Sequence, residues 1–302
     1  MTYVLAVIAA AAFGVNWVLQ QLEAAKAPPD LQMHPLRLLR LLIRKPLWLA
    51  GLLTLVAGSA VQQVALADGS LSVDEALLVL DLVFALLLAD RISRRSVRPS
   101  QWIGAGAVCV GLGGFLAAAA PTAGEGGGAI TRWITCGVVL GGLCVVLVAV
   151  GAAWPGTVRA ICFATASALV FGASDALSKA TFGYATEESL RGLTPMLSHW
   201  QLYGLIVSAV VGLGLGQVAF NAAALPVSLP SLAVGEPIAG LAIGIVALHV
   251  QVRTSPAPLA IACVGAVLVV AGSIVVGRSR VLDVAGQAIG ARAAASTDPG
   301  AS

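Results

Sequence analysis

Residues 228–248 have the sequence SLPSLAVGEPIAGLAIGIVAL, which is apolar and long enough to cross a bilayer, since a spanning helix needs about 20 residues. One carboxylate, Glu236, lies near the middle and is followed directly by Pro237. A charge at this depth costs at least about 2.5 kcal/mol, and proline removes a backbone donor. The stretch therefore predicts a membrane helix that is broken at Pro237 beside an acid lining a solute path. The alternative is a protonated carboxyl that joins two helices by a hydrogen bond.

Composition supports the same class of protein along the whole chain. Of 302 residues, 59% are hydrophobic and 10% are charged, whereas soluble domains carry about 25% charged residues. We therefore expect an all-α polytopic membrane protein that is not an enzyme and has no cofactor. The net charge of +3 is small and the arginines are dispersed in loops, so no nucleic-acid partner is expected. The five cysteines lie in apolar runs without a C-x-x-C pair, which indicates neither disulfides nor zinc.

Apolar runs of this kind recur along the chain and predict about nine transmembrane helices. Because no basic region precedes the first run, it is interpreted as a retained helix and not a cleaved signal peptide. The expected spans are residues 2–21, 47–67, 72–88, 102–119, 133–153, 160–180, 200–223, 228–248 and 257–277.

The segments between the spans are polar, and one of them has a distinct pattern. In the connector of residues 22–45, Leu36 to Ile43 is rich in leucine and arginine. This pattern predicts a short amphipathic helix on an anionic lipid surface. Residues 278–302 are rich in alanine, glycine and serine, which is typical of a disordered tail.

The distribution of basic residues predicts the orientation in the membrane. Arginines and lysines crowd residues 22–45, the loop after the third span and the tail after the ninth. Nine spans place all three segments on one side, which the positive-inside rule assigns to the cytoplasm. We therefore expect a multi-pass protein of the plasma (inner) membrane with its N-terminus outside and its C-terminus in the cytoplasm.

Three short matches between the halves of the chain indicate an internal duplication. They occur in the same order with offsets of 158, 154 and 159 residues: Phe13-Gly14 with Phe171-Gly172, Gln63-Val-Ala with Gln217-Val-Ala, and Gly106-Ala-Val with Gly265-Ala-Val. The predicted organisation is a first repeat (residues 1–120), a linker with the fifth span (121–157) and a second repeat (158–277). Since paired spans lie five apart, the copies insert in opposite directions, as a four-plus-one-plus-four inverted repeat.

This layout resembles the drug/metabolite transporter superfamily, whose halves are called EamA-like domains. The resemblance covers residues 1–277, and the arrangement of spans is most similar to that of the NIPA-type magnesium transporter branch. Residues 77–98, a helix followed by a basic loop, and the glycine-rich residues 103–114 also look like that superfamily. Many members carry a glutamate just before the basic loop, where this chain has Asp90. The resemblance implies transport by alternating access.

The predicted duplication pairs Asp81 of the third span with Glu236 of the eighth. In an inverted repeat both acids approach a cavity at the midplane. Two acids there would suit a hydrated divalent cation such as Mg²⁺, or a proton, because a desolvated carboxyl holds one more readily. A carboxyl bonded to a neighbouring helix is the alternative for Asp81.

Other polar residues at membrane depth are weaker candidates for substrate contact. Asp175 and Lys179 share a helix face, which indicates either an ion pair or a substrate contact. The amides are candidates for ligand contact or for joining helices; they are Gln63, Gln217, Asn16 and Asn221.

The sequence therefore predicts a secondary transporter for a small hydrophilic solute or a divalent cation. A membrane scaffold or accessory subunit that transports nothing is the competing hypothesis, in which the polar groups serve helix packing alone. Membrane lipid and a small-molecule or cation substrate are the expected partners, and the pattern leaves a homodimer open.

Overall fold

The computed structural model describes residues 2–68, 80–93, 99–121, 128–187, 197–223, 225–253 and 255–275. Helices dominate these residues and no strand occurs among them. In chain order the helices are α1 (Thr2–Ala24), the 3₁₀ helix η1 (Pro29–Met33), α2 (Pro35–Leu42), α3 (Pro46–Asp68), α5 (Asp81–Ser93), α6 (Pro99–Ala119), α7 (Ile130–Ala153), α8 (Thr157–Glu187), α10 (Trp200–Ala222), α11 (Leu225–Ala247) and a last helix, Pro256–Val275.

Seven of the described helices are long and apolar enough to cross a membrane, and the bent pair α2–α3 adds an eighth. The chain is therefore a multi-pass membrane protein. Only part of the expected third span, residues 72–88, is described, because residues 72–79 lie outside the described ranges. What is described there is α5, which begins at Asp81 and ends at Ser93 instead of residue 88. The expected sixth span is also longer, since α8 continues to Glu187. The whole of the expected tail, residues 278–302, lies outside the described residues.

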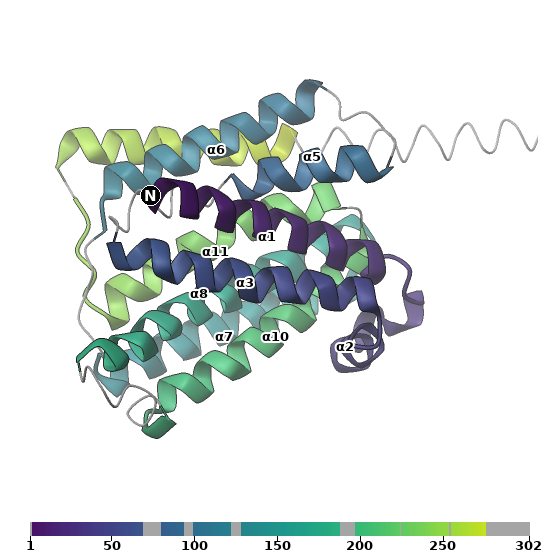
Figure 1. The fold of residues 1–302 in the computed structure, drawn as a ribbon, viewed down its shortest axis with the longest axis horizontal. Helices are drawn as coiled ribbons and strands as arrows, with labels where there is room; N and C mark the ends of the chain where they lie inside the picture. Colours follow the sequence, from purple (N-terminus) through teal and green to yellow (C-terminus); the bar gives the residue numbers. More distant parts are fainter. Residues whose placement is uncertain are drawn as a thin grey trace, which may run out of the picture.

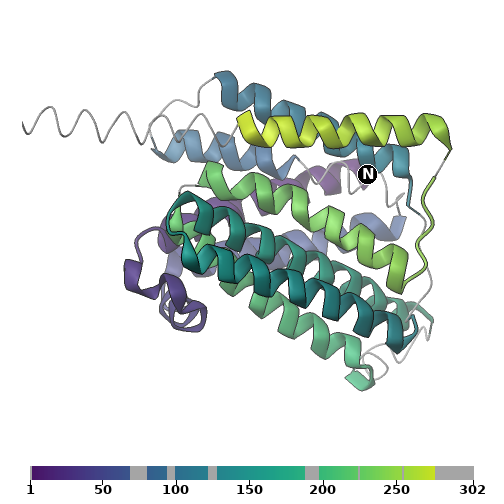
Figure 2. The same ribbon diagram turned by 180° about the vertical axis from the view of Figure 1, so that it is seen from behind.

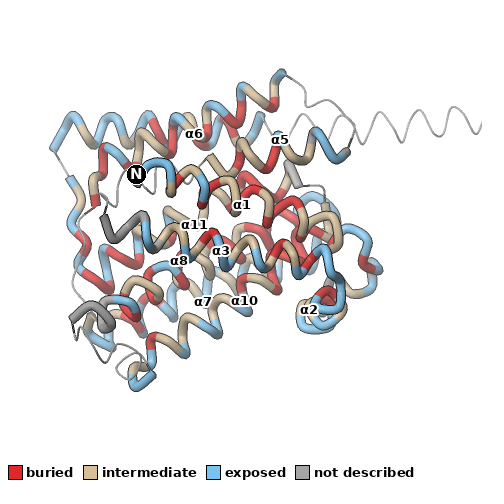
Figure 3. The backbone as a smooth tube through the Cα atoms, in the orientation of Figure 1, coloured by how far each residue is buried: buried red, intermediate tan, exposed pale blue. Residues whose placement is uncertain are grey.

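The helices lie in two groups that meet along α1. In Figure 1, α1 and α3 run side by side, and α8, α10 and α11 form a second group below and behind them. Figure 2 shows α6 beside the last helix on one face of the molecule. Buried residues concentrate where the groups meet, as the colouring of α1 in Figure 3 shows. Helix α7 packs against α8 and is otherwise exposed, with only Trp133, Cys136 and Gly151 buried.

Glycines allow α6 and the last helix to approach closely. A Cβ added at Gly111 would lie 2.6 Å from the carbonyl oxygen of Gly265. Gly272 lies against the backbone of Gly104 in the same way. Because the residue number rises along one helix as it falls along the other, the two helices are antiparallel. Small residues at such crossings let membrane helices gain van der Waals contact.

Helix α2 confirms the amphipathic helix expected at residues 36–43. It makes an angle of 98° with the first part of α3, so it lies along the membrane plane when α3 crosses the membrane. Leu38 and Leu42 are buried against the rest of the protein, and α2 packs against α10, where a Cβ added at Gly214 would lie 3.6 Å from the Cβ of Pro35. The face of α2 that carries its arginines is exposed.

The structure differs from the prediction at Pro237. Helix α11 contains both Pro230 and Pro237 and is not interrupted at either one. Proline removes one backbone donor, but a transmembrane helix tolerates this when neighbouring helices and local adjustments compensate. Pro237 therefore weakens the backbone ladder beside Glu236 without ending the helix.

The crossing of α6 and the last helix generates a prediction on stability. Gly111→Ala forces the two backbones apart, so we expect the free energy of unfolding to fall by about 1–3 kcal/mol, as overpacking does in protein cores. Thermal unfolding of the purified protein in mild detergent measures the change. Gly106→Ala is the matched control on the same helix, because no atom lies within 4 Å of a Cβ added there. Equal melting temperatures for the two variants would contradict the close approach.

Candidate functional site

Asp81 lies in the first turn of α5 and is tied to α1 by a hydrogen bond. The indole nitrogen of Trp17 donates to Oδ2 of Asp81 at 3.1 Å. The other carboxyl oxygen, Oδ1, is buried and has no hydrogen-bond partner among the described residues. A buried polar atom without a partner costs free energy. Asp81 is therefore held in position on one side and has unused bonding capacity on the other.

Glu236 lies on α11 within electrostatic range of two other acids, Asp175 of α8 and Asp81 of α5. Helices α5 and α11 are in contact, and the Glu236 side chain is partly exposed. The two acids that the sequence analysis paired therefore lie on helices that contact each other. They come from opposite halves of the chain, and Asp175 joins them from a third helix.

Both of these acids stand where a glycine lets another helix approach. A Cβ added at Gly14 of α1 would lie 2.8 Å from the backbone oxygen of Asp81. A Cβ added at Gly172 of α8 would lie 2.6 Å from the backbone oxygen of Glu236. Gly14 and Gly172 are the two glycines of the first of the three sequence matches, Phe13-Gly14 with Phe171-Gly172. The same local arrangement therefore occurs once in each half of the chain.

Asp175 and Lys179 lie one turn apart on α8, as their spacing predicts. Asp175 is exposed and Lys179 is half-buried. A Cβ added at Gly240 of α11 would lie 3.8 Å from the Cβ of Asp175, so Asp175 lies along the seam between α8 and α11. This position places it on the same seam as Glu236.

The buried amides form a chain of hydrogen bonds that joins three helices. The Trp48 indole of α3 donates to Oε1 of Gln217 on α10 at 3.1 Å. Gln217 donates to Oε1 of Gln20 on α1, and Gln20 donates to Oδ1 of Asn16 at 2.6 Å. All four side chains are buried. The chain ends at Nδ2 of Asn16, which is buried and has no partner among the described residues.

Asn221 binds the backbone at the end of α1. Its Nδ2 atom donates to the carbonyl oxygens of Ala24, at 2.6 Å, and Ala27, at 2.8 Å. These carbonyls lie at and just beyond the end of α1, where backbone acceptors lack partners within the helix. The contacts of Asn221 therefore join helices. The side chain of Gln63, the other candidate amide, lies outside the described residues.

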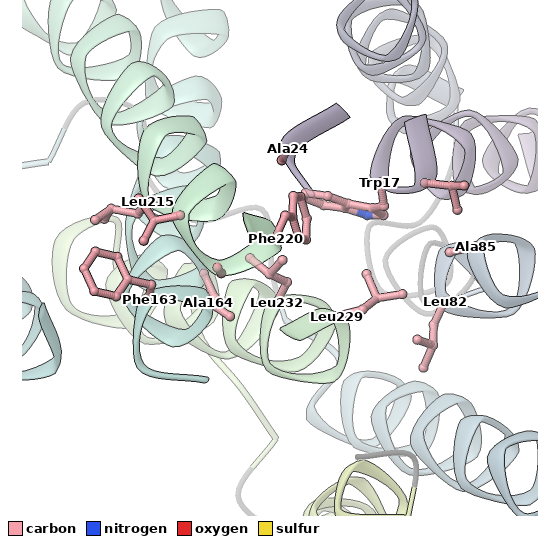
Figure 4. Packing of buried hydrophobic residues seen from close by; sticks show 14 of the residues in the cluster. Trp17, Ala24, Leu82, Ala85, Phe163, Ala164, Leu215, Phe220, Leu229 and Leu232 are labelled. Carbon is pink, nitrogen blue, oxygen red and sulfur yellow. The ribbon is translucent and has the colours of Figure 1, made fainter. Parts of the chain in front are cut away.

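An apolar cluster surrounds the Trp17–Asp81 pair. The ring of Trp17 makes edge contacts with Phe171, at 6.3 Å between centroids, and with Phe220, at 6.0 Å. Figure 4 shows Trp17 beside Phe220, with side chains of α5, α8 and α11 nearby. Such a setting strengthens electrostatic interactions because it excludes water.

The acids do not amount to a complete metal site. Among the described residues, no group of three or more histidine, cysteine, aspartate or glutamate side chains could hold a metal ion. Magnesium commonly keeps several waters and uses one or two carboxylates. Asp81 and Glu236 therefore stay candidates for a hydrated cation, with water supplying the other ligands.

Sequence reasoning gave no role to two residues of the amide chain. Gln20 had a usable signal, because it lies four residues after Asn16 and shares its helix face. Trp48 had none, since its partner Gln217 lies 169 residues away in the sequence. The sequence showed Gly14 and Gly172 as a repeated pair and Asp81 and Glu236 as candidates, but it gave no signal that these glycines lie against the backbone of the acids.

Comparison with known proteins places the chain in a family. It is 30% identical over 247 residues to an uncharacterized protein of Corynebacterium glutamicum, and the match covers 79% of this chain and 82% of the relative. The chain belongs to the same family as that protein. No family model and no solved structure matches the chain at a significant level. Membership of this family brings no substrate with it, so function has to be argued from the site.

The amide chain generates a prediction on stability. Gln217→Leu leaves the Trp48 N–H and the Gln20 carbonyl without a partner, so we expect a loss of about 1–2 kcal/mol in the free energy of unfolding. Thermal unfolding in detergent measures it. Gln62→Leu is the matched control, because no side-chain hydrogen bond of Gln62 occurs within the described ranges. A Gln217→Leu variant as stable as this control would contradict a structural role for the chain.

Proposed function

We propose that the protein is a secondary transporter of the drug/metabolite type, which moves a small hydrophilic solute or a divalent cation by alternating access. The observation that carries the proposal is that Asp81 and Glu236 lie on two helices in contact, α5 and α11, with Asp175 along the seam between α8 and α11. Acids within membrane helices are expensive, and they mark substrate, ion or proton pathways as a rule. Here they come from three helices and both halves of the chain.

An inverted duplication, with about nine spans, is part of the proposal. The matching approaches of Gly14 to Asp81 and of Gly172 to Glu236 support it, as does the antiparallel crossing of α6 and the last helix. In transporters built this way the site lies at the interface between the repeats. The contact between α5, from the first half of the chain, and α11, from the second, supports such a location for Asp81 and Glu236.

Two classes of substrate fit this arrangement. The unpartnered Oδ1 of Asp81 and the nearby Glu236 would accept hydrogen bonds from a cationic or hydroxyl-bearing solute. They would equally bind the water shell of a divalent cation. Both classes need negative charge at the site, so the same variants test them.

A scaffold or accessory subunit is the second candidate, and specific contacts favour it. Gln217 and Asn221 are both used in bonds between helices. If the acids serve packing as well, the main candidates for substrate contact are all used in joining helices. The two functions differ in what neutral replacements of the acids do to stability.

A transport assay with neutral variants tests the proposal. The purified protein is first screened by thermal shift against amino acids, sugars, nucleosides, polyamines and the chlorides of Mg²⁺, Mn²⁺ and Ca²⁺. Each hit is then tested for uptake into proteoliposomes. We expect Glu236→Gln and Asp81→Asn each to reduce uptake by at least about tenfold, because the charge that binds the substrate is gone.

The control is Glu23→Gln, which removes the same charge at the end of α1, where Glu23 pairs with Lys26 at 2.6 Å. This variant should transport normally. Unchanged uptake by Glu236→Gln would remove Glu236 from the mechanism. If both acid variants unfold in detergent while Glu23→Gln does not, the scaffold function gains the support.

We also propose insertion in the plasma membrane with the N-terminus outside and the C-terminus in the cytoplasm. The exposed arginines on α2 support this orientation, because basic residues next to spans collect in the cytoplasm.

A reporter fusion tests this orientation. We expect green fluorescent protein fused after residue 302 to fluoresce in intact cells, because it matures in the cytoplasm, whereas alkaline phosphatase fused there should be inactive. The opposite pair of results would overturn the orientation.

A further inference from the structure

The segment that joins α1 to α3 has an exposed basic surface, which we call the α2 surface. It consists of Arg37, Arg40, Arg44 and Lys45 with the exposed apolar side chains Leu36 and Ile43. None of the four cations has an ion pair or hydrogen bond within the described ranges. Four positive charges thus face outward beside apolar groups.

Three of these arginines surround a shallow hollow. Arg37, Arg40 and Arg44 line it together with Leu31 of η1 and Leu41, and its volume is about 270 Å³. Its lining is mostly apolar, from the two leucines and the carbon stems of the three arginines, while the arginine side chains as a whole are exposed on the α2 surface. Guanidinium groups match phosphate oxygens with paired hydrogen bonds.

The position of the hollow relative to the bilayer indicates where its ligand comes from. Helix α2 is turned by 98° from α3 and lies at the end of the spans, as Figure 1 shows. A helix in this position lies at headgroup level. Leu36 is 76% exposed and Ile43 is 48% exposed, so both are available to insert among acyl chains next to the arginines.

We propose that this hollow binds the phosphodiester headgroup of an anionic phospholipid. The arginines hold the phosphate, Leu31 and Leu41 contact the glycerol and the first acyl carbons, and Leu36 and Ile43 enter the lipid beside it. A lipid, and not a soluble phosphate, is the occupant because apolar side chains line and flank the charged groups. The inference does not depend on what the protein transports.

Lipid binding here would also stabilise the contact between the two halves. Leu38 and Leu42, on the inner face of α2, belong to the main apolar cluster. Helix α2 packs against α10, and α3 begins just after α2 with Trp48 near its start, bonded to Gln217. A headgroup that fixes α2 therefore favours the conformation in which α10 and α1 are joined.

The test measures lipid binding by the full chain. Delipidated protein in mild detergent is titrated with phosphatidylglycerol, phosphatidylcholine or inorganic phosphate, and bound lipid is counted by native mass spectrometry. We expect saturable binding of phosphatidylglycerol, at least about tenfold tighter than that of phosphatidylcholine. The triple variant Arg37→Gln/Arg40→Gln/Arg44→Gln should weaken it at least about tenfold, since each basic residue near an anionic surface contributes to binding.

The control is Arg278→Gln/Arg280→Gln/Arg292→Gln, which removes the same three charges elsewhere and should leave affinity unchanged. Equal loss in both triple variants would overturn the proposal, because it would indicate general charge attraction. Competition by inorganic phosphate at the same concentration as the lipid would also overturn it in favour of a soluble anion. If the first triple variant is not monodisperse, the three single variants decide, each with an expected loss of about threefold against unchanged single controls.

Discussion

An amide buried among membrane helices needs a partner for each of its polar atoms, and Gln217 satisfies this requirement across three helices. Its oxygen accepts from Trp48 of α3 and its nitrogen donates to Gln20 of α1. Because both bonds depend on one side chain of α10, the positions of α1, α3 and α10 are fixed relative to one another. Helix α2 precedes α3 and packs on α10, so its place follows from the same constraint.

The second constraint is the absence of side chains at two positions. Gly14 and Gly172 let α5 and α11 approach α1 and α8 until backbone touches backbone. The acids next to these contacts, Asp81 and Glu236, are thereby brought from the two halves of the chain into electrostatic range of each other. Apolar side chains would fill these positions at a lower free-energy cost, so packing alone does not account for two acids here.

Much of the fold followed from local pattern. Hydrophobic runs predicted the long helices, and the spacing of leucine and arginine predicted α2. Each of these signals is local, because it depends only on residues close together in the sequence. Pro237 was wrongly expected to end its helix, since whether a proline breaks a membrane helix depends on what its neighbours supply. The duplication paired Asp81 with Glu236, and the helices that carry them, α5 and α11, are in contact. Which amides pair could not be predicted: Gln217 bonds Trp48 and Gln20, and these contacts depend on how the halves dock.

Four hydrogen bonds between the halves lie toward the same end of the molecule. Two belong to Gln217 and two to Asn221, which stand one turn apart on α10. Moving α10 away from α1 would break these bonds together, because a rigid helix carries all of them. Separation at this end is therefore a cooperative step, and a partly opened intermediate would bear the full cost of the lost bonds before new ones form.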